Sequence, residues 1–172
     1  MKMEQPSWTR DMPTPLVVGI ATLGPLGRRM KAPGTWGSLA GTLYFVLCFS
    51  YMGILGNLIA SAIGAYVAIG FCGEAEQRLG KSDPGEIILD EFVAMPLCFL
   101  GWQWIVPACG LAYLGLLAAG FALFRAYDIG KPLMINSMQK LPGGWGVVID
   151  DTAAALATCA TLHAAHLMWV LL

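Results

Sequence analysis

Two adjacent carboxylates end the segment Gly143-Gly144-Trp145-Gly146-Val147-Val148-Ile149-Asp150-Asp151. The rest of the chain, Thr152 to Leu172, is apolar and contains no Asp, Glu, Lys or Arg. This run has the length of a membrane span, because a helix needs about 20 apolar residues to cross a bilayer. Placing carboxylates at the end of such a span costs free energy unless a cation pairs with them. The sequence therefore predicts a cation site beside a transmembrane helix.

A second acidic pair repeats the arrangement, because Asp90-Glu91 directly precedes the charge-free run Phe92 to Phe124. Glu86 lies four residues before Asp90, so on a helix the two side chains would share a face. Mg²⁺ is commonly held by one or two carboxylates together with water and a phosphate. We therefore expect Asp90, Glu91, Asp150 and Asp151 to hold Mg²⁺, with Glu86 as a further candidate ligand. The simpler explanation, acidic first turns that stabilise helix N-termini, accounts for either pair more readily than for both.

The composition is that of an integral membrane protein. Of the 172 residues, 57% are hydrophobic and 12% are charged, and the mean hydropathy is +0.66. A soluble domain has roughly twice that charged fraction, about 25%. The net charge of -1 argues against nucleic acid as a partner. The five cysteines form no C-x-x-C pair, so neither a zinc site nor a disulfide framework is indicated.

The charge-free runs predict an all-α, polytopic membrane helical bundle with about five transmembrane helices. Ala32 to Gly73 is long enough for two spans joined by a turn at Gly53–Asn57. Phe92 to Phe124 is a tight fit for two more, with a hairpin tip at Gly101–Trp104, and Thr152 to Leu172 is the last span. Each of these runs is bounded by polar, charge-bearing sequence.

The N-terminal part is expected to differ from the bundle. Pro15 to Leu26 is apolar but too short to cross a bilayer, so it is predicted to be a re-entrant or interfacial segment. Residues 1–14 form a polar leader, either disordered or lying on the surface. The predicted organisation is therefore this leader followed by a single membrane-embedded domain over residues 15–172.

Every Lys, Arg, Asp and Glu lies in one of three segments: Met1–Lys31, Glu74–Glu91 and Arg125–Asp151. If each intervening run crosses the membrane twice, all three segments fall on the same side. The positive-inside rule makes that side cytoplasmic. The acidic pairs are thereby expected to meet at one membrane surface.

Basic residues accompany the acids on this side. Arg125, Asp128 and Lys131 recur at intervals of three before Pro132, which places them along one helix face. The guanidinium group of Arg can donate two parallel hydrogen bonds to phosphate oxygens, and the ammonium group of Lys provides a compact positive charge. Lys31 precedes the Gly-rich segment Pro33–Ser38, and a loop before a helix N-terminus is a potential anion site. Arg28 and Arg29 could instead bind anionic headgroups or fix the topology.

Two other patterns are interpreted as structural. Cys72 and Arg78 have the C-x5-R spacing of cysteine phosphatases, but Glu74 and Glu76 between them would oppose a phosphate dianion and a thiolate. His163 and His166 share a helix face well inside the last apolar run, far from the carboxylates. We expect these histidines to belong to the core or to the far membrane interface.

Four clusters together resemble the bacterial phosphatidylglycerophosphatase A family. They are Pro33-Gly34-Thr35 with Gly37-Ser38, then Asp90-Glu91, then Arg125, Asp128 and Lys131-Pro132, and last Gly143-Gly144 and Gly146 with Asp150-Asp151. Each motif is weak alone, but their order and spacing are specific, and the likeness runs from about Leu23 into the last span. The position of Glu86 is not part of the family pattern.

The resemblance implies an inner-membrane, Mg²⁺-dependent lipid phosphatase that hydrolyses phosphatidylglycerophosphate to phosphatidylglycerol and phosphate. On this interpretation Mg²⁺ and one carboxylate, among the four or Asp128, would assist attack of water on phosphorus. Arg125, Lys131 and Lys31 would hold the phosphoryl oxygens, with Thr35 and Ser38 as lesser donors. A carboxylate nucleophile that forms an aspartyl-phosphate is the alternative mechanism.

Two other function classes compete with the phosphatase. A small ion or proton-coupled transporter would use the acidic residues as ion sites, but the acids lie at the ends of spans rather than at their centres. A scaffold or lipid-binding protein without chemistry is the third possibility. Oligomeric state and selectivity among lipid phosphates are not indicated by the sequence.

Overall fold

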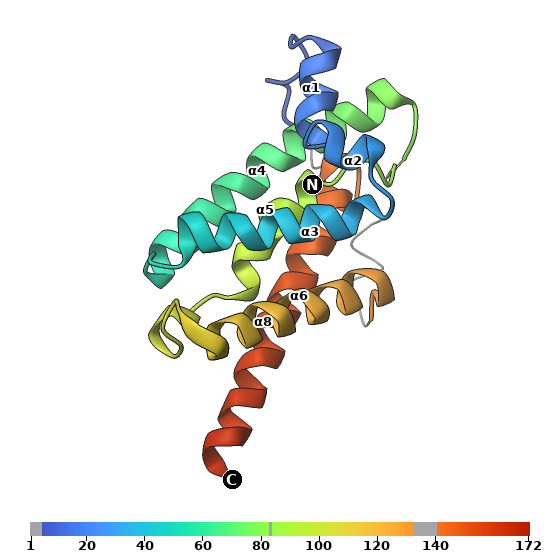
Figure 1. The fold of residues 1–172 in the computed structure, drawn as a ribbon. Helices are drawn as coiled ribbons and strands as arrows, with labels where there is room; N and C mark the ends of the chain where they lie inside the picture. Colours follow the sequence, from blue (N-terminus) through green and yellow to red (C-terminus); the bar gives the residue numbers. More distant parts are fainter. Residues whose placement is uncertain (1–4, 83, 133–140) are drawn as a thin grey trace.

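The computed structural model describes residues 5–82, 84–132 and 141–172, and every regular element within these ranges is helical. Figure 1 shows the helices as one bundle, with α5 in the middle and α8 running obliquely past the others to the C-terminus. The elements are α1 (Thr14–Ala21), α2 (Pro25–Arg29), α3 (Pro33–Tyr44), the π-helical η1 (Phe45–Phe49), α4 (Ile54–Leu79), α5 (Leu89–Cys98), the 3₁₀ turn η2 (Trp102–Trp104), α6 (Gly110–Gly130) and α8 (Gly144–Leu171).

Three of the helices in these ranges are long and apolar enough to cross a membrane: α4, α6 and α8. The other two predicted spans are shorter, since α3 has 12 residues before η1 adds five, and α5 has only 10. At 1.5 Å per residue, α5 extends roughly 15 Å, about half a bilayer core. Pro96 lies in its last turn, and Gly101 just beyond it adopts a φ of +84°. The all-helical prediction is therefore confirmed, whereas five full spans are not established.

The C-terminal helix begins earlier than its charge-free run. α8 starts at Gly144, so Asp150 and Asp151 lie inside the helix instead of in a polar segment before it. Gly143 caps it with a φ of +58°, a conformation that L side chains rarely adopt. A Cβ on Gly144 would lie 2.0 Å from the Ile69 carbonyl oxygen of α4. These two glycines therefore let the start of α8 approach α4 closely.

The N-terminal segment, residues 5–14, contacts α4 and lies on the surface of the bundle. Thr9 is fully buried, and its hydroxyl donates to the Gly70 carbonyl over 3.2 Å. Trp8 packs edge-on against Phe71. After it, α1 and α2 divide the predicted interfacial segment into two pieces far too short to span a bilayer.

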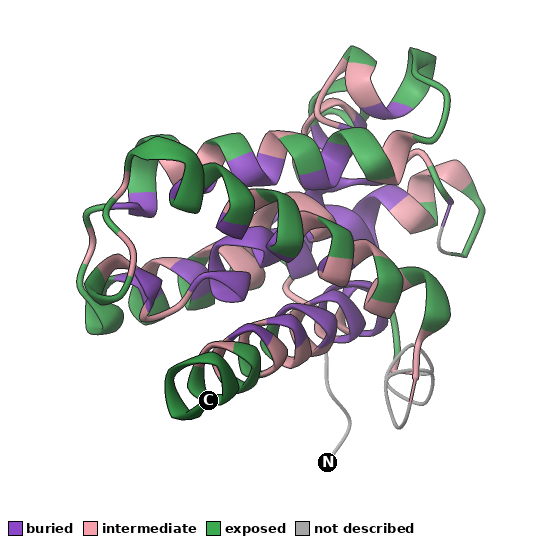
Figure 2. Cartoon of the chain, turned by 60° about the horizontal axis from the view of Figure 1, so that its bottom comes forward, coloured by how far each residue is buried: buried purple, intermediate pink, exposed green. Residues whose placement is uncertain are grey.

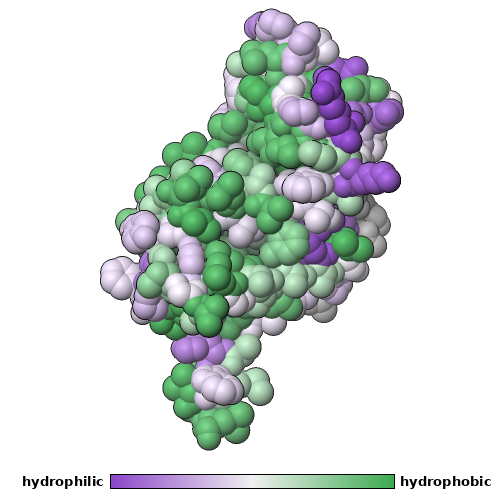
Figure 3. Space-filling view, viewed as in Figure 1, coloured by the Kyte–Doolittle hydropathy of each residue, from purple (hydrophilic) through white to green (hydrophobic). Residues whose placement is uncertain are grey.

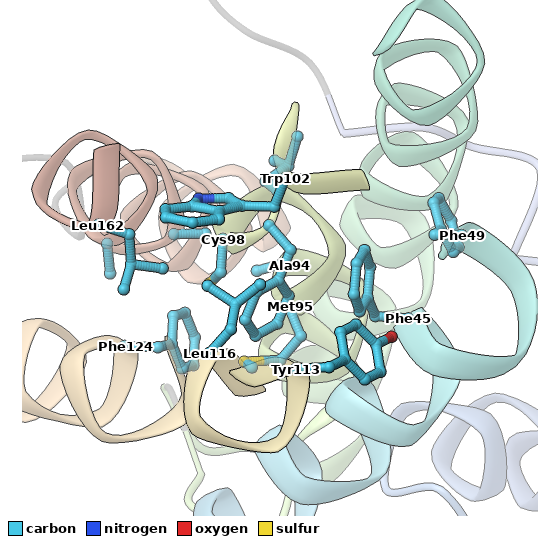
Figure 4. Close-up of a cluster of buried hydrophobic side chains, with 14 residues drawn as sticks. Phe45, Phe49, Ala94, Met95, Cys98, Trp102, Tyr113, Leu116, Phe124 and Leu162 are labelled. Carbon is cyan, nitrogen blue, oxygen red and sulfur yellow. The ribbon is translucent and has the colours of Figure 1, made fainter. Parts of the chain in front are cut away.

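Two apolar clusters hold the bundle together. The larger one lies between α3–η1, α5, η2, α6 and α8, and Figure 4 shows its side chains converging on Met95 and Cys98 of α5. The smaller one joins α1 and α4 to the first turns of α5 and α8. Figure 2 shows buried positions on the facing sides of the helices and exposed ones on the outer sides, with the end of α8 wholly exposed. An exposed apolar surface of this kind suits contact with lipid.

The charged ends of the helices gather at one end of the molecule. In Figure 1 the end of η1 and the loop before α6 lie together on the left, away from the C-terminal ends of α4 and α6. On the face seen in Figure 3, hydrophilic side chains collect around α1 and α2, whereas hydrophobic ones cover the middle of the bundle and the end of α8. This agrees with the prediction that the polar segments share one side.

Candidate active site

The first turn of α5 supplies the first two carboxylates. Asp90 is buried at 5% exposure, and the Glu91 side chain keeps 13%. Acidic side chains are favourable in a first turn because the helix N-terminus carries partial positive charge. The dipole explanation thus applies to this pair. It does not apply to α8, whose first turn contains no acidic residue.

The second pair lies on the buried face of α8. Asp150 and Asp151 are 3% and 4% exposed, and the Asp151 backbone N–H donates to Asp150 Oδ1 over 3.0 Å. Their position nearly two turns into the helix follows from the early start at Gly144. Buried carboxylates in a helix interior gain little from helix ends, so they need partners from elsewhere.

The C-terminal end of α6 supplies the cations. Arg125 Nη1 lies 2.5 Å from Asp128 Oδ2 and 3.6 Å from Glu91 Oε1, so it bridges α6 and α5. Lys131 follows the last residue of α6 and lies 2.5 Å from Asp150 Oδ2 through its Nζ. Lys131 adopts a φ of +39°, which is uncommon for a residue with a side chain. Arg125 and Asp128 share a helix face as predicted, while Lys131 reaches the same place from the left-handed cap.

These side chains line one cavity of about 130 Å³. The polar groups around it are Asp90, Glu91, Asp128, Lys131, Asp150 and Asp151. Within it, Asp90, Glu91 and Asp151 each offer an oxygen, and the three oxygens lie within 4.8 Å of one another. Sequence segments that are about 60 residues apart thus converge on a site with the donor set that Mg²⁺ prefers.

The charge balance at this cavity favours a bound cation. Among the described residues, five carboxylates face two cationic side chains, Arg125 and Lys131, which leaves these groups with more negative than positive charge in a poorly solvated place. Burial raises the pKa of Glu91 to about 7, an effect that the hydrogen bond with Asp90 and the Arg125 charge only partly oppose. Glu91 Oε2 is buried and has no hydrogen-bond partner among the residues that the structure describes. A divalent cation would satisfy this oxygen and offset the excess charge.

The Gly-rich segment plays a different part from the one that its sequence indicated. It is the first half of α3 rather than a loop, and its glycines face the acidic cluster. A Cβ on Gly34 would lie 2.4 Å from Glu91 Oε1, and one on Gly37 would lie 3.2 Å from Glu91 Oε2. The prediction of a loop is therefore wrong, and Gly34 and Gly37 allow α3 to pack directly against the carboxylate.

Three of the predicted phosphate ligands, Lys31 and the lesser donors Thr35 and Ser38, are not among the residues that line the cavity. Ser38 is fully buried and donates its hydroxyl to the Gly34 carbonyl over 2.8 Å. Thr35 and Lys31 are exposed at the start of α3 and before it. Glu86 lies in the turn before α5, 3.9 Å from Lys81, so the expected helix face shared with Asp90 does not exist.

The C-x5-R pair and the two histidines, which we interpret as structural, do not line the acidic cavity. Cys72 is buried, and Arg78 pairs with Glu74 at 2.9 Å while donating to backbone carbonyls of the N-terminal segment. His163 and His166 pack on Trp102, and His163 Nε2 lies 2.8 Å from the Leu100 carbonyl oxygen. Both histidines thus lie in the half of α8 beyond the acidic cavity.

Sequence reasoning overlooked three parts of the site wall. Gly85, Ile87 and Val147 line the cavity together with the polar groups. Glycine and aliphatic side chains carry no chemical signal, so only their neighbours in sequence, Asp90 and Asp150, could have indicated them.

Comparison with known proteins agrees with this constellation. The family model described as Phosphatidylglycerophosphatase A matches residues 19–166, which include every side chain of the cavity. The chain belongs to the phosphatidylglycerophosphatase A family.

Three bacterial relatives each match more than two thirds of the chain. The chain is 39% identical over 131 residues to a phosphatidylglycerophosphatase A of Haemophilus influenzae, which covers 73% of each protein. It is 30% identical over 137 residues to a phosphatidylglycerophosphatase A of Escherichia coli, covering 76% of this chain and 72% of the relative. A Bacteroides thetaiotaomicron protein named putative phosphatidylinositol-3-phosphatase is 30% identical over 151 residues, covering 81% and 86%. No solved structure gives a significant match.

Proposed function

We propose that the protein hydrolyses the terminal phosphomonoester of phosphatidylglycerophosphate, releasing phosphatidylglycerol and phosphate for phospholipid biosynthesis. The observation that carries the proposal is the cavity where Asp90, Glu91 and Asp151 converge beside Lys131 and Arg125, within a chain of this family. A phosphomonoester needs cationic groups to hold its oxygens and a charged centre to stabilise the transition state. Both kinds of group are present, and the apolar helices suit a lipid substrate.

Mg²⁺ is the cofactor that the donor set fits best. Asp90, Glu91 and Asp151 would hold it, and Asp150 borders the same space while it contacts Lys131. When bound, Mg²⁺ would neutralise phosphoryl charge and lower the pKa of a coordinated water.

The remaining charged groups have separate tasks in this proposal. Lys131, held by Asp150, would bind a phosphoryl oxygen. Arg125, oriented by Asp128 and Glu91, would orient the phosphate or its leaving oxygen. One of the five carboxylates would accept a proton from water, or would itself attack phosphorus. Single-turnover hydrolysis in ¹⁸O-water separates these routes, because direct water attack labels the released phosphate and an aspartyl-phosphate can label the protein.

The membrane arrangement forms part of the proposal. We place α4, α6 and α8 across the inner membrane, with α3–η1 and α5 entering the bilayer as shorter helices to complete five crossings. The charged end of the bundle then faces the cytoplasm under the positive-inside rule. The lipid headgroup would reach the cavity from that surface while the acyl chains remain in the bilayer.

The decisive experiment measures phosphate release from phosphatidylglycerophosphate by purified protein, with Mg²⁺ and with EDTA. Asp90→Asn and Asp151→Asn should reduce Mg²⁺-dependent release at least about 100-fold while folding in detergent is retained. Glu86→Gln is the matched control, because Glu86 is acidic and close in sequence but lies outside the cavity. Equal turnover in EDTA would refute the metal assignment, and wild-type rates in both Asn variants would refute the site.

A substrate panel should include phosphatidylinositol 3-phosphate, because one relative is named for that lipid. The transporter alternative is not favoured, since the family model and the relatives named above are all phosphatases by name.

A further inference from the structure

An apolar groove of about 430 Å³ runs along the outer face of α3, apart from the acidic cavity. Its size lies in the range of ligand pockets, roughly 300–1,000 Å³. The apolar side chains that line it are Leu26, Trp36, Leu39, Ala40, Leu43 and Val46. Those on α3 recur at helical spacing and form one stripe that no helix of the described residues covers. Thr42 also lines the groove, but its hydroxyl is committed to the Ser38 carbonyl over 2.9 Å.

The helix α2, which contributes to the groove, is also cationic. Leu26 belongs to α2, and the same short helix carries Arg28 and Arg29 in its last turn. Both arginines are exposed, and together with Gly24 and Pro25 they line a second hollow. Neither forms an ion pair with an acidic group in the described part of the chain. An apolar groove with two exposed arginines on one of the helices that line it matches an acyl chain attached to an anionic headgroup.

The groove and the acidic cavity use opposite sides of the same helix turns. Trp36 and Leu39 point into the groove, while Gly34 and Gly37 abut Glu91. A lipid lying in the groove would therefore have its headgroup beside the N-terminal turns of α3, which border the catalytic carboxylates. Phosphatidylglycerophosphate has a phosphodiester between its tails and its terminal phosphate, so it carries two anionic groups in the required order.

We propose that the groove over Trp36 and Leu43 binds one acyl chain of the substrate lipid, and that Arg28 and Arg29 bind the inner phosphodiester. The terminal phosphomonoester then reaches the acidic cavity around the start of α3. This assignment rests on the proposed function for its substrate. It gives the exposed arginines, which the reaction at phosphorus does not use, a role in substrate selection.

A kinetic experiment tests the groove directly. Ala40→Phe fills it and should raise KM for a long-chain substrate roughly tenfold, the effect of excluding two methylenes. For a dihexanoyl analogue both KM and kcat should be unchanged. The matched control is Ala62→Phe, which makes the same change at an exposed position of α4 away from the groove. Equal effects on both substrates, or no effect on either, would overturn the proposal.

A binding experiment keeps the proposal testable if no lipid phosphate is hydrolysed. The chain has six tryptophans, and the difference between wild type and Trp36→Phe isolates the fluorescence of Trp36. Phospholipids with brominated acyl chains should quench this signal at lower mole fraction when they are anionic than when they are zwitterionic. Arg28→Gln combined with Arg29→Gln should abolish the preference. Equal quenching by both lipids in wild type would overturn the groove assignment, whereas absent turnover would refute only the proposed function.

Discussion

Lys131 Nζ lies 2.5 Å from Asp150 Oδ2, joining the cap of α6 to the interior of α8. The Asp150 side chain is 4% exposed and that of Lys131 is 23% exposed, so the pair is largely desolvated. Removing one member of such a pair takes the opposite charge away from a buried group, which costs more than the pair contributes. Variants of these two residues can therefore separate the contribution of the pair to stability from the contribution of Lys131 to catalysis.

The first prediction concerns this pair. Lys131→Met should lower the free energy of unfolding by about 2–3 kcal/mol, less than for a fully buried pair because Lys131 is partly exposed. The double variant with Asp150→Asn should recover most of that stability. Phosphate release should stay at least about 100-fold reduced in both, because the phosphate-binding cation is missing. Activity that returns together with stability in the double variant would show that Lys131 is only structural.

The second prediction concerns the contact between α3 and Glu91. In Gly34→Ala the new Cβ would lie 2.4 Å from Glu91 Oε1 and 3.0 Å from Arg125 Nη1, so the carboxylate must move. Activity should fall tenfold or more, since a displacement of about 1 Å can cost two orders of magnitude. Gly115→Ala on α6 is the control, because nothing lies within 4 Å of its Cβ position. That variant should keep full activity and gain up to about 1 kcal/mol from helix propensity. The same gain with full activity in Gly34→Ala would contradict the contact.

Sequence patterns predicted the residues of the candidate site because charged residues are few in an otherwise apolar chain. The two acidic pairs lie at the edges of apolar runs in the sequence, and Asp90 and Asp151 from these pairs lie together at one cavity in the structure. Composition likewise predicted the helical class. Both inferences depend on the large free-energy cost of placing a charge next to lipid. This cost can be recognised from a charged residue and its neighbours in the sequence alone.

The parts that sequence did not predict depend on close packing. Gly34 was interpreted as part of an anion-binding loop, but its role is to admit Glu91 and Arg125 against α3. The start of α8 at Gly144 depends on the approach to Ile69, a residue far away in the chain. The short α5 reflects Pro96 and the turn after it, whereas hydropathy alone suggests a continuous span. Such contacts are set by the tertiary structure and leave little trace in hydropathy.

The third prediction concerns pH and metal binding. Burial raises the pKa of Glu91 from its ordinary value of 4.5 to about 7 in the metal-free protein, so a proton is bound more tightly in the folded state. This contribution to stability is fully present below pH 4.5 and is lost as the pH rises through about 7. In EDTA, the Tm should therefore fall across this window. The fall should be smaller in Glu91→Gln.

Mg²⁺ should act in the opposite direction, because it displaces that proton. The increase in Tm caused by a fixed Mg²⁺ concentration should be larger at pH 8 than at pH 6. Asp128→Asn serves as a control, since Asp128 lies outside the group of three close oxygens and should retain the trend. A Mg²⁺ effect that is independent of pH would exclude Glu91 as a ligand.

The last prediction concerns the attachment of the N-terminal segment. Arg78 donates to the carbonyls of Met12, Arg10 and Thr9 over 2.7, 3.0 and 3.2 Å, and to Glu74 over 2.9 Å. Hydrogen bonds from a charged donor contribute about 1.5–3 kcal/mol each when their loss leaves buried partners unsatisfied. Arg78→Gln should therefore lower Tm and speed amide hydrogen exchange and proteolysis at residues 5–13.

Arg10→Gln is the control, because the Arg10 side chain is exposed and only its carbonyl is used. Since Arg78 does not line the cavity, KM for the lipid should not change below the new Tm. A rise in KM without faster exchange would instead place Arg78 in substrate binding.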